Sequence, residues 1–176
     1  MTNRTIHEAT VYVMTEQPTV TLNNGVVMPQ LGFGVFKVPP DDTVAPVRRA
    51  LEAGYRHIDT AAMYGNEAGV GKAIVQSGVP RGDIFVTTKL NNPDQGYDDA
   101  LRAFERSRAT LGLDVIDLYL IHWPLPPRDR YVPTWRALEK LLADGAVRAI
   151  GVSNFQPAHL QRLAEQTDVV PAINQI

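Results

Sequence analysis

The feature that most constrains the fold is a strand–helix unit that repeats along most of the chain. Short apolar segments alternate with amphipathic segments of helical periodicity, and glycine or proline separates them. Strands that are apolar along nearly their whole length are expected to be covered on both faces, and the alternation predicts parallel strands joined by right-handed crossovers. We expect Asp41 or Asp42 to cap the first helix and Asn66 the second. The expected strands are 31–36, 55–59, 84–89, 115–122, 147–154 and 169–176, and the expected helices are 43–52, 67–77, 98–111, 134–143 and 157–166.

A short β-hairpin is predicted before this repeat, at residues 19–29. An Asn-Gly pair supplies the positive φ angles that a tight turn between two apolar segments requires. We assign residues 19–176 to one domain. Residues 1–18 are expected to be a mobile N-terminal extension, in which Met14 is an alternative start.

The composition is that of an ordinary globular protein, with 44% hydrophobic and 20% charged residues. A formal net charge of −2 gives no indication of nucleic acid or an anionic membrane surface as a partner. No segment approaches the roughly 18 apolar residues of a membrane span, and without cysteine the chain has no disulfides, thiolate chemistry or cysteine-ligated metals. These properties lead us to expect a cytoplasmic protein that acts on a small molecule.

Two architectures fit the repeat, a doubly wound open sheet and a (β/α)₈ barrel. A barrel gathers the carboxyl ends of its strands around one mouth, whereas an open sheet spreads them along a row. No glycine-rich dinucleotide fingerprint follows the first strand. Because five consecutive strands end in polar side chains, the sequence predicts an α/β fold of the TIM (β/α)₈ type, of which this chain holds about six strands and five helices. These strand-end residues are Asp59, Lys89, His122, Ser153 with Asn154, and Asn174 with Gln175.

Four side chains near these strand ends suit proton transfer to a carbonyl oxygen. Tyr64 follows the second strand, and a tyrosine with a pKa of about 10 becomes a useful general acid when a nearby ammonium stabilises its phenolate. Lys89 is expected to supply that charge and lower the pKa of Tyr64, while Asp59 keeps Lys89 charged. His122 is expected to hydrogen-bond the substrate oxygen.

Carbonyl reduction also needs a hydride donor, which no side chain provides, so a nicotinamide or similar cofactor is required. Ser153, Asn154 and Gln175 offer the hydrogen-bond donors and acceptors that could hold a carboxamide.

Each of these groups also has a structural interpretation. Asp59 and Lys89 could form only an ion pair, and Ser153 with Asn154 could only cap the helix that follows. His57 and Asp59 share a strand face, as metal ligands can, but no second ligand pair has matching spacing. We therefore predict no metal site.

Several motifs together resemble the aldo-keto reductase family, and the resemblance runs from about residue 19 to the last residue. Residues 34–40 are most similar to the bacterial branch that includes 2,5-diketo-D-gluconic acid reductases. The motifs that carry the family resemblance are 54–61 with 64–67, 87–90, 117–124, 150–155 and 174–176.

The resemblance implies a (β/α)₈ barrel that binds NADPH in an extended form and reduces an aldehyde or ketone, including a keto-sugar acid, to the alcohol. It implies that Tyr64 is the proton donor of a tetrad completed by Asp59, Lys89 and His122. The carboxamide would be held by Ser153, Asn154 and Gln175, and the substrate mouth would be lined by Phe36, Met63 and Trp123.

The sequence departs from the family pattern in two places. Asn91 stands where an aromatic residue usually follows the Thr-Lys-Leu motif, which changes the expected shape of the pocket. The family continues past the Asn-Gln-Ile motif, so we expect a chain that is truncated relative to its family. A monomer is expected for the full-length family and self-association for six strands with open edges. The rival interpretation is a non-catalytic remnant, or a half-barrel that needs a partner.

Overall fold

The computed structural model describes residues 17–176. The expectations of a mobile extension and of an alternative start at Met14 fall almost wholly on residues 1–16 and lie outside the described residues. The described part begins with the predicted β-hairpin, in which β1 (Thr19–Thr21) pairs antiparallel with β2 (Val27–Pro29).

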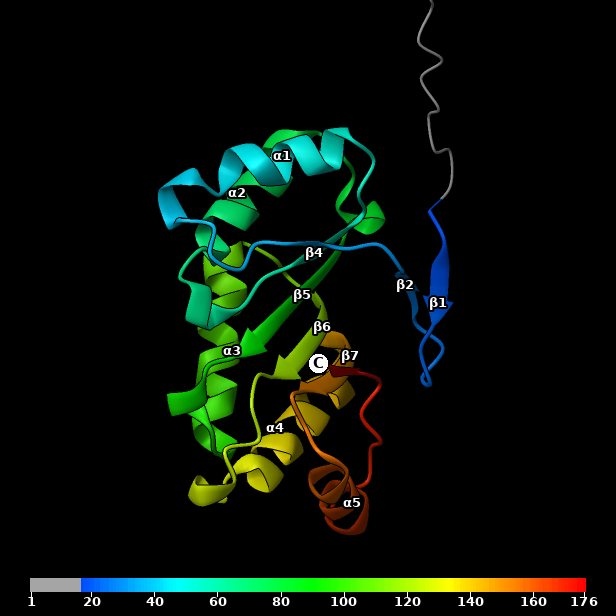
Figure 1. Ribbon diagram of the computed structural model, residues 1–176, viewed down its shortest axis with the longest axis vertical. Helices are drawn as coiled ribbons and strands as arrows, with labels where there is room; N and C mark the ends of the chain where they lie inside the picture. Colours follow the sequence, from blue (N-terminus) through cyan, green and yellow to red (C-terminus); the bar gives the residue numbers. More distant parts are fainter. Residues whose placement is uncertain (1–16) are drawn as a thin grey trace, which may run out of the picture.

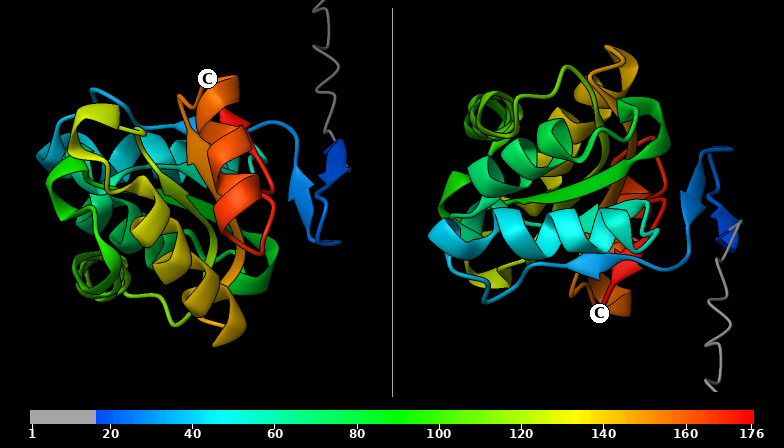
Figure 2. Two further views of the ribbon diagram at one scale, coloured as in Figure 1. Left: turned by 90° about the horizontal axis from the view of Figure 1, so that it is seen from below. Right: turned by 90° about the horizontal axis from the view of Figure 1, so that it is seen from above.

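A parallel sheet of six strands forms the centre of the molecule, and its strands lie in the order of the sequence. All five neighbouring pairs are parallel. The helices cover one face of this curved sheet, as in the wall of a barrel (Figures 1 and 2). The predicted α/β fold of the (β/α)₈ type, present over six strands, is confirmed. The strands are β3 (Phe33–Gly34), β4 (His57–Asp59), β5 (Phe85–Leu90), β6 (Ile116–Ile121), β7 (Val147–Ser153) and β8 (Asn174–Gln175).

Five α-helices occupy the predicted places between the strands. No helix within residues 17–176 combines the length and apolar character needed to cross a bilayer. The helices are α1 (Val44–Glu52), α2 (Glu67–Ser77), α3 (Tyr97–Leu111), α4 (Tyr131–Ala143) and α5 (Pro157–Gln166).

The predicted helix caps are wrong. Asp41 and Asp42 lie inside a short 3₁₀ helix, η1 (Pro40–Asp42), and Thr43 takes the position before α1. Asn66 does precede α2, but its side chain does not cap the helix. It is turned instead toward the loop that follows β3, because the main-chain carbonyls of Val35 and Val38 there need donors.

The first and last strands of the sheet are much shorter than predicted. For the segment expected at 169–176, main-chain pairing with β7 begins only at Ala172, whose N–H donates to the Ile150 carbonyl at 2.9 Å. The residue before it, Pro171, has no N–H to contribute to a ladder, which delays the pairing.

Two apolar layers lie on opposite faces of the sheet, since side chains alternate along each strand. The larger layer lies between sheet and helices and includes the fully buried Trp135 and Phe104. The smaller layer lies on the inner face, where Leu118 and Leu120 of β6 pack with Leu22 and other side chains of the hairpin. By the same alternation, inner-face positions at the carboxyl ends of the strands are free for polar groups.

A close approach between α2 and α3 gives a first prediction. In α2, a Cβ atom added at Gly71 would lie 2.1 Å from the main-chain oxygen of Leu111, the last residue of α3. Alanine is intrinsically the better helix former by about 1 kcal/mol, but here it forces the helices apart. We expect Gly71→Ala to lower the free energy of unfolding by about 1–3 kcal/mol, measured by urea denaturation.

Gly82→Ala is the control for this substitution, because a Cβ at Gly82 meets no atom within 4 Å. We expect it to leave the free energy of unfolding within about 0.5 kcal/mol of the wild-type value. A Gly71→Ala protein as stable as the wild type would contradict the helix contact described here.

Candidate active site

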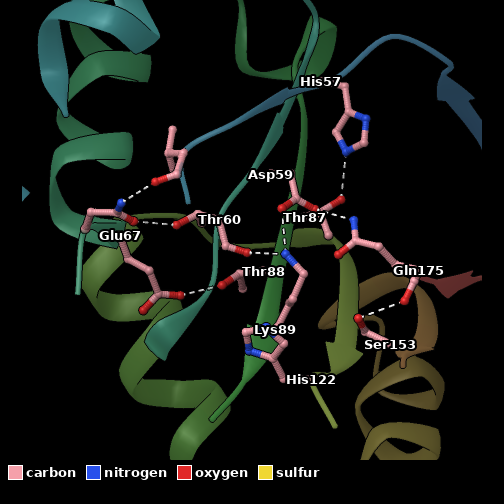
Figure 3. Close-up of polar contacts among 12 residues, drawn as sticks. His57, Asp59, Thr60, Glu67, Thr87, Thr88, Lys89, His122, Ser153 and Gln175 are labelled. Carbon is pink, nitrogen blue, oxygen red and sulfur yellow. Dashed lines mark hydrogen bonds and ion pairs between the residues drawn. The ribbon is translucent and has the colours of Figure 1, made fainter. Parts of the chain in front are cut away.

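Inward-facing side chains from four neighbouring strands meet at one end of the sheet (Figure 3). Asp59 ends β4, Lys89 lies near the end of β5, His122 follows β6 directly, and Ser153 ends β7. The sequence predicted this gathering from strand ends alone. It arises because parallel strands in register all present their carboxyl ends at the same edge.

The Lys89 ammonium is the centre of the hydrogen bonds in this group. Its Nζ donates to Oδ1 of Asp59 at 2.5 Å and to the Thr60 carbonyl at 3.0 Å. Only 1% of its side chain is exposed, so burial lowers the pKa of Lys89, while the negative charge of Asp59 opposes that shift. The second carboxylate oxygen of Asp59 accepts a hydrogen bond from Nε2 of Gln175 at 2.9 Å, which links β4 to β8.

The Tyr64 ring lies beside this ion pair, carried by a short 3₁₀ turn, η2 (Ala62–Tyr64). The Lys89 Nζ is 5.3 Å from the ring centroid, and the His122 ring packs edge-on at 5.7 Å. We expected Lys89 to lower the pKa of Tyr64. The structure contradicts this: burial, and then the charge of Asp59, raise the pKa of Tyr64. The reason is that Asp59 lies against the ammonium and offsets its charge.

The His122 imidazole is 7% exposed and neutral near pH 7. Burial, followed by the positive charge of Lys89, lowers the pKa of His122 to about 4. Its Nδ1 atom is buried without a hydrogen-bond partner among residues 17–176. A neutral imidazole can donate one hydrogen bond and accept another, so His122 can orient a polar ligand without carrying charge.

The three residues predicted to hold a carboxamide lie together where β7 and β8 end. The amide Nδ2 of Asn154 donates to the His122 carbonyl and to the Ser153 hydroxyl, both at 3.0 Å. The Ser153 hydroxyl donates to the main-chain oxygen of Gln175 at 2.9 Å. Asn154 has a φ of +62° and does not cap α5, whose N-cap position is held by Gln156, so the structural interpretation of these residues as a helix cap is wrong.

Two acceptor atoms remain open in this group. No residue of the described chain donates to Oδ1 of Asn154 or to Oε1 of Gln175. These oxygens suit the NH₂ group of a primary carboxamide. The Ser153 hydroxyl, in contrast, is already engaged within the chain, so its predicted contact with a ligand would require it to release the Gln175 carbonyl.

Three exposed apolar side chains belong to the loops near the tetrad. The predicted mouth residues Phe36, Met63 and Trp123 are 63%, 43% and 44% exposed, which is unusual for side chains of this size. Phe36 packs against Tyr64 with ring centroids 5.1 Å apart. Gln95, buried behind the loop, fixes Trp123 by donating to its carbonyl at 2.6 Å.

The alternative of a metal-binding pair at His57 and Asp59 gains no support. His57 Nε2 lies 2.9 Å from the Thr87 hydroxyl, one layer below Asp59 on the inner face. Within residues 17–176, no group of three or more histidine, aspartate or glutamate side chains could hold a metal ion.

Sequence reasoning missed the residues that hold the tetrad in place. It did not find that Gln175 orders Asp59, or that Thr60 presents a carbonyl to Lys89. Asn66 and Glu67, read as a helix start, are buried polar residues: the partner of Asn66 is Thr60 in the loop after β4, and that of Glu67 is Thr88 on β5. The signal in the sequence that could have found them is their position: two polar residues come directly after the Tyr64 loop, at the start of a helix.

The lowered pKa of His122 predicts a pH-dependent stability. In the unfolded chain this imidazole titrates near its ordinary value of 6.5, and in the folded protein near 4. Between those values the unfolded state binds the proton and the folded state does not, so stability falls as the pH drops from 6.5 to 4. We expect His122 to account for about 2–3 kcal/mol of that loss.

Urea denaturation of wild type and of His122→Gln at pH 6.5 and pH 4 measures this contribution. The carboxylates titrate in both proteins and cancel in the difference, so the variant should lose less stability over the interval. Equal losses in the two proteins would show that His122 is not held neutral.

Comparison with known proteins matches this geometry to a family. The model of the aldo/keto reductase family matches residues 30–176. Over 159 residues the chain is 56% identical to an aldo-keto reductase of Mycolicibacterium smegmatis and 54% identical to a glyoxal reductase of Bacillus subtilis. These alignments cover 90% of this chain but 58% and 57% of the relatives, so the chain spans little more than half the length of the curated relatives it matches.

Solved structures agree with the sequence comparison. An aldo/keto reductase from Brucella melitensis superposes with a TM-score of 0.89 at 56% identity, over 92% of this chain and 63% of that one. A Bombyx mori aldo-keto reductase in complex with NADP gives a TM-score of 0.84 at 39% identity, over 92% of this chain and 58% of that one. The chain belongs to the aldo/keto reductase family.

Proposed function

We propose that the protein reduces an aldehyde or ketone to the alcohol with hydride from NADPH, and that Tyr64 protonates the carbonyl oxygen. The observation that carries the proposal is the packing of the Tyr64 ring against both the Lys89 ammonium, at 5.3 Å, and the His122 ring, at 5.7 Å. A carbonyl oxygen at this edge of the sheet would meet a hydroxyl, a cation and an imidazole together.

The protonation states support Tyr64 as the acid. Near pH 7 the phenol holds its proton, because its pKa is raised above the ordinary value. The His122 imidazole, with a pKa of about 4, has no extra proton to give. Transfer from Tyr64 leaves a phenolate, and the nearby Lys89 ammonium offsets part of the cost that burial and the charge of Asp59 impose on it.

Lys89 and His122 have supporting roles in this mechanism. The Asp59 carboxylate and the Thr60 carbonyl keep the buried Lys89 protonated and fix its position. A neutral His122 aligns the carbonyl by hydrogen bonding, so that its oxygen lies near the Tyr64 hydroxyl. Alignment of this kind lowers the barrier by removing the entropy of orientation from the reaction step.

The residues proposed to bind the cofactor are Asn154 and Gln175. The Ser153 hydroxyl supports both, because it accepts from Asn154 and donates to the Gln175 carbonyl. When bound, NADPH supplies the hydride that reduces the carbonyl carbon. The open amide oxygens of Asn154 and Gln175 would accept hydrogen bonds from the carboxamide and hold the nicotinamide edge. The Bombyx mori relative solved with NADP supports NADPH as the cofactor.

The substrate in this proposal is a small carbonyl compound that fits an apolar mouth formed by Phe36, Met63 and Trp123. The name of the Bacillus subtilis relative, a glyoxal reductase, favours a short dicarbonyl. The similarity of residues 34–40 to diketo-gluconic acid reductases favours a keto-sugar acid as the second candidate. Turnover of glyoxal and of 2,5-diketo-D-gluconate, measured side by side, decides between these substrate classes.

Substitution of the proposed acid tests this function. We expect Tyr64→Phe in the natural protein to lower kcat for carbonyl reduction by roughly 10²- to 10⁴-fold, because the proton donor is removed while the ring remains. Binding of NADPH, measured by fluorescence titration, should stay within about twofold of wild type, because no proposed cofactor contact is lost.

Tyr97→Phe is the matched control, since it removes a partly exposed hydroxyl at the start of α3, outside the site. Its kcat should equal that of the wild type. A kcat equal to that of the wild type in Tyr64→Phe would contradict the proposed role of Tyr64 as the proton donor. A wild-type protein that binds NADPH but reduces no carbonyl would favour the non-catalytic interpretation.

A further inference from the structure

Glu67 is a buried acid for which the proposed mechanism has no use. It is the first residue of α2 and is 6% exposed. Within residues 17–176 its carboxylate forms no ion pair, and its two partners are hydroxyls: Thr88 Oγ1 at 2.6 Å and Ser107 Oγ at 3.2 Å. Burial raises the pKa of Glu67, and these two hydrogen bonds oppose the shift. A buried carboxyl group of this kind is costly, so its geometry needs an explanation.

The two ends of the Glu67–Thr88 hydrogen bond lie next to two members of the tetrad. Glu67 is three residues after Tyr64, on the same continuous segment. Thr88 is directly before Lys89 on β5, and its side chain points to the helix layer while that of Lys89 points inward. The hydrogen bond therefore joins the segment that carries the phenol to the strand that carries the ammonium (Figure 3).

The neighbouring Asn66 completes the connection on the other side. Its amide Nδ2 donates to the carbonyls of Val35 and Val38, at 3.0 and 3.1 Å, and its Oδ1 accepts from the Thr60 hydroxyl at 2.8 Å. The main-chain oxygen of Thr60 is itself an acceptor of the Lys89 ammonium. The loops after β3 and β4 are thus held to the start of α2, and the Glu67–Thr88 hydrogen bond ties that start directly to β5.

We propose that Glu67 is a positioning residue, whose hydrogen bond to Thr88 sets the distance between the Tyr64 ring and the Lys89 ammonium. This inference rests on the proposed function of those two groups. The carboxylate contacts Thr88 and Ser107, and it acts on the tetrad through the main chain on either side. Ser107 supports the same carboxylate from α3, a helix that carries no member of the tetrad.

The test compares substitutions of the two hydroxyl partners in the natural protein. Thr88→Val removes the hydroxyl and keeps the shape, and we expect kcat to fall about 10- to 100-fold while the Kd for NADPH stays within about twofold. Thr88→Ser keeps the hydroxyl and should restore kcat to within about threefold of wild type. Ser107→Ala is the matched control, and it should lower Tm without changing kcat by more than about twofold.

Two kinetic outcomes would overturn the proposal. One is an unchanged kcat in a folded Thr88→Val protein. The other is an equal loss of kcat in Thr88→Val and Ser107→Ala, which would point to general loosening of the fold. If Thr88→Val does not fold, Thr88→Cys takes its place, because a thiol is only a weak donor. An unchanged kcat in Thr88→Cys would then overturn the proposal.

A spectroscopic measurement separates this proposal from the proposed function. The ¹³Cζ signal of Tyr64 in tyrosine-labelled protein, assigned by its loss in Tyr64→Phe, reports the ring's surroundings without cofactor or substrate. We expect it to move in Thr88→Val and to stay in place in Ser107→Ala. If the Tyr64 signal moves in Thr88→Val but the wild-type protein reduces no carbonyl, only the reductase proposal is refuted. If the wild-type protein reduces carbonyls but the Tyr64 signal does not move in Thr88→Val, the proposed role of Glu67 is refuted.

Discussion

The arrangement of the site depends on one lysine ammonium held almost entirely away from water. An isolated charge in such a place would lose its proton or disrupt the fold. Lys89 keeps both its place and its charge because Asp59 at the end of β4 and the Thr60 carbonyl just after it supply a negative charge and a dipole at hydrogen-bonding distance. Gln175, from the far side of the sheet, fixes the second oxygen of Asp59. The charge thereby ties strands β4, β5 and β8 to one another.

This ion pair also contributes to the protonation states of two neighbouring groups. Burial lowers the pKa of His122, and the ammonium lowers it further, so the imidazole is neutral near pH 7. Burial likewise raises the pKa of Tyr64, and the Asp59 carboxylate raises it further. The phenol thus retains a transferable proton at neutral pH, and the imidazole retains a hydrogen bond without a charge.

Much of this could be predicted from the sequence, because the barrel pattern has a strong periodic signal. Alternating apolar and amphipathic segments predicted the six strands and five helices, and the carboxyl ends of those strands placed Asp59, Lys89 and His122 at one edge. Interactions across the fold could not be predicted in this way. Asn66 was expected to cap a helix, since local pattern favours that role, but tertiary partners at Val35 and Thr60 compete better for its amide. The prediction that the pKa of Tyr64 is lowered was wrong for the same reason, because the sequence shows neither how far the ring is buried nor how closely Asp59 approaches the ammonium.

The alternation of side chains along β5 has a consequence for how such a protein can change. Phe85, Thr87 and Lys89 lie on the inner face of the sheet, while the residues between them face the helices. Substitutions at every second position of this strand can therefore change the inner surface of the sheet without changing the layer that packs against the helices. Insertion or deletion of a single residue in this strand would exchange the two surfaces, and so would destroy the site and its support together.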